Sequence, residues 1–76
     1  MNTGYFKQQG STHIIYGRVV DLLKNGGLKL IAVTICDGHT SKAKQLSTKG
    51  SFPAFIEIDP KDIPIKILNK INAKFN

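Results

Sequence analysis

The apolar positions of this chain are concentrated between His13 and Cys36, where two runs of aliphatic residues flank Asn25-Gly26-Gly27. β-branched side chains favour strands, and an Asn-Gly pair between two such runs is typical of a two-residue hairpin turn. We therefore predict a β-hairpin over residues 13–36, and we expect the rest of the chain to pack around it.

The predicted two-residue turn places Tyr16 opposite Ile35 on one face of the hairpin and Val19 opposite Ala32 on the other. A turn that uses all of Asn25-Gly26-Gly27 shifts this register by one residue. Both faces are largely apolar, so we expect the hairpin to be covered on both sides or to curl into a barrel. The first arm also has a helical interpretation, because several of its apolar residues share a helical face and Asn-Gly suits a C-terminal cap.

Three further segments follow the hairpin. Residues 39–51 are polar and predict either one or two helical turns or a long loop. Residues 52–59 alternate in polarity and predict a third strand, which starts at a sheet edge because Pro53 has no amide hydrogen to donate. A final helix is expected to begin at about Ile63 or Pro64. Its apolar stripe consists of Ile67, Leu68, Ile71 and Phe75.

Together these elements predict an α+β fold in one domain, residues 1–76. It consists of a small curved antiparallel sheet of three to four strands built on the 13–36 hairpin, with a C-terminal amphipathic helix. A barrel-like sheet is the second interpretation, and a helix over residues 13–25 in an α-β-α-β-α order is the third. Residues 1–10 are a candidate flexible arm, in which Tyr5-Phe6-Lys7 suit an edge strand, a lid or an exposed stacking surface.

The amino-acid composition indicates a basic chain and a reducing cellular compartment. The net charge is +6, from 11 basic and 5 acidic residues, and such a chain is attracted to polyanions, although a solvated lysine surface is the ordinary explanation. The single cysteine excludes an intramolecular disulfide and favours a reducing compartment. The sequence shows neither a secretory h-region nor an apolar run long enough to span a membrane, so we expect a cytoplasmic protein without a membrane partner.

These observations predict a non-enzymatic nucleic-acid-binding module that contacts phosphates through lysines. The candidate binding residues are Arg18, Lys29, Lys42, Lys44, Lys49 and Tyr16. Tyr16, or alternatively Tyr5-Phe6, would stack on bases. The alternative function is a protein-interaction module, such as an inhibitor, an adaptor or a small homodimer, that uses the helix stripe or a sheet edge.

Cys36, His39 and His13 form the one cluster that suggests site chemistry. A zinc site or a Cys-His nucleophile pair is the sharper interpretation, and a small thiol at a strand end beside two solvated imidazoles is the ordinary one. Zinc signatures show paired spacings, and only one half-motif is present here. No G-x-S-x-G, H-E-x-x-H or Walker A motif occurs, so we expect neither an enzyme nor a cofactor.

One resemblance to a known fold is present, to the first two strands of OB-fold barrels. The residues that carry it are Gly17-Arg18-Val19-Val20, then Asn25-Gly26-Gly27, then an apolar strand that ends at Asp37-Gly38. Small translation-factor and S1-like domains begin in a similar way. The resemblance covers about a third of the chain and implies binding of single-stranded RNA or DNA on the barrel face.

Overall fold

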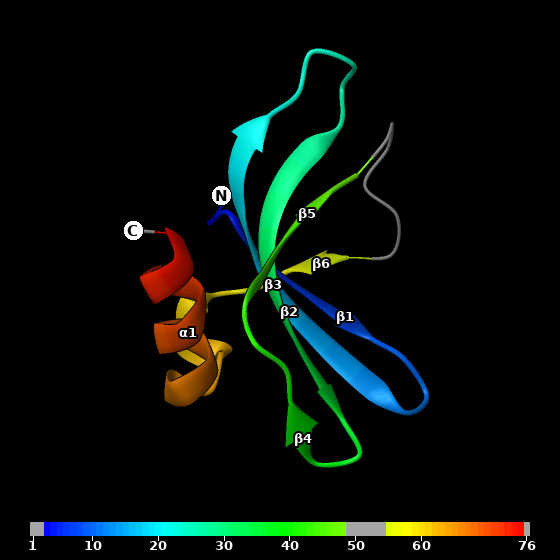
Figure 1. Ribbon diagram of the computed structural model, residues 1–76, viewed down its shortest axis with the longest axis vertical. Helices are drawn as coiled ribbons and strands as arrows, with labels where there is room; N and C mark the ends of the chain where they lie inside the picture. Colours follow the sequence, from blue (N-terminus) through cyan, green and yellow to red (C-terminus); the bar gives the residue numbers. More distant parts are fainter. Residues whose placement is uncertain (1–2, 49–54, 76) are drawn as a thin grey trace.

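The computed structural model describes residues 3–48 and 55–75 of the chain. Within these ranges the chain forms one antiparallel sheet, a short 3-10 helix and one α-helix (Figure 1). The strands are β1 (Tyr5–Gln9), β2 (His13–Leu22), β3 (Leu28–Cys36), β4 (His39–Thr40), β5 (Lys44–Ser47) and β6 (Ile56–Glu57). The 3-10 helix covers Pro60–Asp62, and α1 covers Ile65–Phe75.

The sheet is open and has the order β4-β3-β2-β1-β6, while β5 pairs with the same edge of β3 as β4 does. The helix lies against one face of β2 and β3 (Figure 1). The predicted α+β class, the hairpin and the C-terminal helix are therefore confirmed. The prediction of three to four strands is wrong, because the described residues form a six-stranded sheet. A barrel-like or OB-fold sheet is not supported, and the helical interpretation of residues 13–25 is wrong.

The register of the β2–β3 hairpin differs from the prediction by two residues. Tyr16 pairs with Val33 in place of the predicted Ile35. One residue of the shift arises at the turn, which begins one residue earlier than predicted, and a bulge between Val19 and Asp21 adds the second. Because side chains alternate between faces with a period of two, the double shift leaves the residues before the bulge on their predicted faces. Beyond the bulge the shift is one residue, so Asp21 pairs with Lys29 and lies on the face opposite to the predicted one. The partition of the hairpin into two apolar faces is confirmed.

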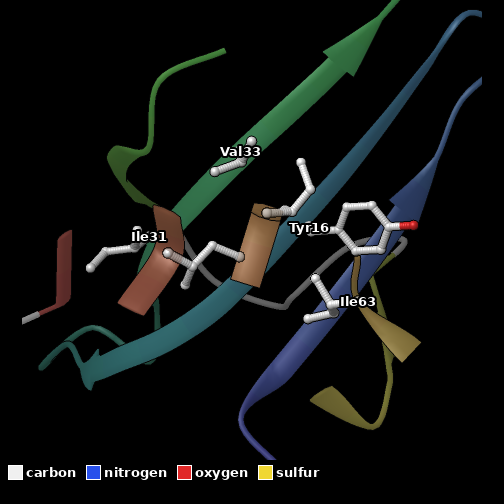
Figure 2. Close-up of a cluster of buried hydrophobic side chains, with 6 residues drawn as sticks. Tyr16, Ile31, Val33 and Ile63 are labelled. Atoms are coloured by element: carbon white, nitrogen blue, oxygen red, sulfur yellow. The ribbon is translucent and has the colours of Figure 1, made fainter. Parts of the chain in front are cut away.

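The main core lies between α1 and one face of β2 and β3 (Figure 2). Its buried members are Tyr16, Ile31, Val33, Ile63, Ile67 and Ile71. Ile71 is 0% exposed and Ile67 is also buried, so most of the predicted helix stripe is used inside the chain. Phe75, at the end of the stripe, remains partly exposed.

Local hydrogen bonds determine where α1 begins. The carboxylate of Asp59 accepts the amide of Lys61 at 2.8 Å and caps the 3-10 helix. The carbonyl of Pro64 accepts the amide of Leu68 at 3.0 Å, so the helix starts at Ile65, close to the predicted position. No helix within the described ranges is long and apolar enough to cross a membrane.

Small residues line the sheet face that α1 does not cover. Gly17 pairs with Ala32, and a Cβ on Gly17 would lie 3.3 Å from the carbonyl oxygen of Ile31. Leu30 on this face is only 1% exposed, and Leu46 of β5 pairs with it. Leu30 is therefore buried on the face that α1 does not cover, where its strand neighbours are Val19 and Leu46.

A close approach at Gly27 holds the end of β5 to the start of β3. The amide of Thr48 donates to the carbonyl of Leu28 at 2.8 Å, and the amide of Leu28 donates to Thr48 Oγ1 at 2.9 Å. A Cβ on Gly27 would overlap the carbonyl oxygen of Thr48. Position 27 therefore requires glycine for space.

Two predictions for the polar half of the chain need correction. Within residues 39–48 the structure has β4 and β5, and neither the helical turns nor the long loop that we expected. Of the predicted strand over residues 52–59, only Ile56–Glu57 are a strand in the described part, and residues 52–54 lie outside it. Residues 5–9 of the candidate flexible arm form β1, which lies between β2 and β6, so this part of the arm belongs to the sheet.

Substitution of Ile71 by alanine is expected to lower the free energy of unfolding by about 2–5 kcal/mol, because it leaves a cavity at a fully buried site. Ile65→Ala is the matched control, since Ile65 lies on the same helix and is 66% exposed. We expect the control to change the free energy by less than about 0.5 kcal/mol. Urea denaturation followed by circular dichroism measures both, and equal losses would contradict the packing described here.

Candidate functional site

Lysines gather where the helix faces the β4–β5 segment. The ammonium of Lys70 donates to the carbonyl of Ser41 at 3.3 Å, which joins α1 to this segment. Lys66 and Lys74 stand one helical turn before and after Lys70 and so share its flank. Lys42 follows Ser41 directly in the chain. All four lysines are exposed.

A cleft of about 270 Å³ continues this flank at the C-terminal end of α1. Lys29 of β3 and Lys74 of the helix both line it. Asp21 is the acid among the described lining residues, and its carboxylate accepts the amide of Leu22 at 2.8 Å. The cleft is completed by Val20, Ile31, Gln45 and Phe75. It therefore combines two cations and an amide with an apolar floor.

We call this region the basic surface and define it by Lys29, Lys42, Lys66, Lys70 and Lys74. Its two main segments, residues 39–48 and α1, contain no aspartate or glutamate. Three of the five acids of the chain lie instead between residues 57 and 62, on edge strand β6 and the turn that leads to the helix. Acids and lysines are thus largely separated along the chain, although Asp21 stands opposite Lys29 in the strand register. We expect a positive potential over α1 and residues 39–48.

Two of the predicted phosphate ligands, Lys29 and Lys42, belong to this surface, and Lys44 does not. Lys29 lies on β3, Lys44 begins β5, and Lys42 lies between β4 and β5. Lys44 pairs with Ala32, so it leaves the edge strand toward the face away from the helix. Lys49 lies outside the described residues.

Arg18, a fourth predicted ligand, is occupied inside the chain. Its guanidinium carbon lies 3.9 Å from the ring centre of Phe75 and 5.2 Å from that of Tyr5. Its Nη1 donates to Asn72 Oδ1 at 2.8 Å, and the Tyr5 hydroxyl donates to the same oxygen at 3.2 Å. The Arg18 side chain thereby ties β1 and β2 to α1, and its role as a phosphate ligand stays a prediction.

The predicted stacking residues are also occupied. Tyr16 is 7% exposed and forms part of the core, with its hydroxyl directed outward (Figure 2). The ammonium of Lys7 lies 5.8 Å from the centre of its ring. Stacking of Tyr16 on a base stays a prediction, and this burial leaves little of its ring accessible. Tyr5 is covered by Arg18, and Phe6 is half-buried on the sheet face away from the helix.

Phe75 is the aromatic residue that the sequence interpretation missed. Phe75 is 42% exposed and lines the same cleft as Lys29 and Lys74. The helical spacing assigned it to the buried stripe. Its position in the last turn of α1, at the rim of the core, was the available signal that it would remain accessible.

His13, Cys36 and His39 occupy one row across β2, β3 and β4, as neighbouring register positions. The imidazole of His13 nevertheless packs over Gly10, where a Cβ would lie 2.6 Å from its Cε1 atom. Cys36 Sγ lies 3.9 Å from a carboxylate oxygen of Asp37. Among residues 3–48 and 55–75 no three such side chains are grouped so that they could hold a metal ion. The zinc interpretation is therefore not supported.

A scan against models of protein families gave no match, and searches of curated proteins and of solved structures gave no significant match. Any functional proposal must therefore come from the charge and geometry of the chain itself.

Asn72→Ala is expected to lower the free energy of unfolding by about 1 kcal/mol, because it removes the shared acceptor of Arg18 and Tyr5. Asn69→Ala is the matched control, since Asn69 is exposed on the same helix and should contribute less than about 0.5 kcal/mol. Thermal and urea denaturation of both variants provide the measurement. An Asn72 variant as stable as the control would contradict a structural role for the Arg18 contacts.

Cys36→Ser should leave the free energy of unfolding within about 0.5 kcal/mol of the starting value, because the thiol is exposed. We also expect zinc to leave the melting temperature of the unsubstituted chain unchanged. Differential scanning fluorimetry with zinc and with a chelator tests both statements. A zinc-dependent rise that disappears in Cys36→Ser would restore the metal interpretation.

Proposed function

We propose that this chain is a non-enzymatic nucleic-acid-binding module that holds backbone phosphates on the basic surface. The bond between Lys70 and Ser41 is the observation that carries the proposal. It brings two segments together that each carry several lysines and no acid. Lysines arranged in this way bind phosphates and release condensed counterions, which is the main source of sequence-independent affinity.

The cations of the basic surface are lysines, which favour binding to the nucleic-acid backbone over recognition of a particular base sequence. Lysine offers a hydrated point charge, whereas bidentate contacts to guanine or phosphate require arginine. The one arginine, Arg18, is held by Asn72 and two aromatic rings. We therefore propose that the basic surface binds the nucleic-acid backbone with little preference among sequences.

Helix geometry sets the size of the contact. Lys66 and Lys74 are eight residues apart, which corresponds to about 12 Å along α1. Phosphates of one strand advance by about 3.4 Å along a B-form duplex, so this row faces about three or four of them. With Lys42 and Lys29, we expect about five phosphate contacts and a strong dependence of affinity on salt.

The protein-interaction alternative is weakened in one of its two forms. A partner that binds the helix stripe would have to displace the sheet from Ile67 and Ile71, both of which are buried. A partner that pairs with a sheet edge would use β6, where Ile56 is exposed. Recovery of a protein partner that survives nuclease treatment is the result that would favour this second form.

Replacement of Lys42, Lys70 and Lys74 by glutamine is expected to weaken oligonucleotide binding by at least about tenfold at about 50 mM salt. The salt dependence should also flatten, with its logarithmic slope reduced by about 2, because three phosphate contacts are lost. The matched control replaces Lys7, Lys24 and Lys61, which changes the net charge equally but outside the basic surface. Mobility-shift titrations at about 50 and 200 mM salt compare the two variants.

The control variant should retain most of the affinity and most of the slope. Equal losses in both triple variants would show attraction by net charge alone and would contradict a defined surface. Absence of binding by the unsubstituted, folded chain at low salt would refute the proposed function itself.

A further inference from the structure

The ring of Phe75 has an arrangement that differs from the other aromatics of the chain. The guanidinium of Arg18 covers one face of the ring, with 3.9 Å between its Cζ and the ring centre. The residue is nevertheless 42% exposed, and it lines the cleft at the end of α1. An aromatic ring supported from behind by a cation is a rigid platform on which a second planar group can stack.

The cleft has the dimensions of a fragment site. Its volume is about 270 Å³, which falls below the range of about 300–1,000 Å³ that is usual for pockets of drug-sized ligands. One heteroaromatic ring system suits such a space better than a larger molecule. The apolar floor of Val20 and Ile31 would contact the ring, and the amide of Gln45 would offer both a donor and an acceptor to its edge.

The charges around Phe75 suit the chain that would carry such a ring. Lys29 and Lys74 line the same cleft and would offer cations to the phosphates next to a stacked base. Asp21 lines the cleft as well and stands opposite Lys29 in the strand register, so its carboxylate offsets part of this positive charge. The Arg18 guanidinium behind the ring adds a further positive charge. A nucleotide within a strand matches this combination of a platform and flanking cations.

We propose that this cleft is a subsite for one unstacked nucleobase, with Phe75 as the stacking residue, so that the ligand of the basic surface is a single strand of DNA or RNA. The inference rests on the proposed function and adds the class of nucleic acid. In a duplex each base is stacked on its neighbours and paired, and it cannot enter the cleft without being extruded. Single strands present their bases freely and stack on exposed aromatic rings.

The chain contains no tryptophan, so Phe75→Trp introduces a single fluorescent reporter at the platform. Leu46→Trp is the matched control, because Leu46 is 43% exposed and pairs with Leu30 on the face away from the helix. Titration with a single-stranded oligothymidylate is expected to quench the fluorescence of Phe75→Trp and to leave that of Leu46→Trp nearly unchanged. Phe75→Leu should weaken single-strand binding by about 5- to 100-fold, the effect of one lost stacked base.

The lysine contacts remain in Phe75→Leu, so its binding should keep the salt slope of the unsubstituted chain. Phe75→Trp retains an aromatic ring for Arg18, and its melting temperature and fluorescence test the subsite even if Phe75→Leu folds poorly. Unchanged affinity of a folded Phe75→Leu, or equal binding of duplex and single strand, would overturn the subsite while the basic surface stands. Absence of oligonucleotide binding by the unsubstituted chain would overturn the proposed function and the subsite together.

Discussion

The fold has to bury a hairpin that is apolar on both faces. The one short helix, α1, covers only one of these faces, so the other must be buried differently. On the covered face, Ile67 and Ile71 of α1 pack against β2 and β3. On the other face, Leu30 is buried beside its strand neighbours Val19 and Leu46, without a second helix. A small domain has few side chains with which to bury apolar area, so both solutions are needed at once. The remaining strands extend this sheet at its two edges.

The same packing separates two kinds of cation. The one arginine lies between aromatic rings and joins the sheet to the helix, whereas the lysines of α1 and of the β4–β5 segment remain in solvent. Phe75 belongs to both groups, because Arg18 covers one side of its ring and the residue lines the cleft. A contact that stabilises the fold thereby also fixes the orientation of the candidate stacking surface. Such support from residues behind a site is what holds a binding geometry in place.

The hydrophobic pattern predicted the hairpin, its two faces and the helix stripe, since each depends on a local periodicity. It did not predict the bulge after Val19, because two adjacent valines suit a regular strand equally well. The pattern did not predict β5, because its side chains are largely polar and it forms where the backbone of β3 offers hydrogen bonds. It indicated β1 only in part, since Tyr5-Phe6-Lys7 suited a lid or a stacking surface as well as an edge strand. The contacts of Arg18 with Asn72 and Phe75 span more than fifty residues, and no local pattern records them.

The close approach of Thr48 to Gly27 predicts which residues homologues of this chain should conserve. Where the backbone of one strand occupies the space of a missing Cβ, selection acts on the glycine even if every surrounding side chain drifts. A distant homologue should therefore keep glycine at this site, together with the left-handed pair Asp37-Gly38 that turns β3 into β4. The lysines, by contrast, can exchange positions along a flank as long as the local charge is conserved. Homologues of this chain should therefore share the glycines at its tight backbone positions. On the surface they should share the local charge that suits the ligand, without sharing the individual lysines.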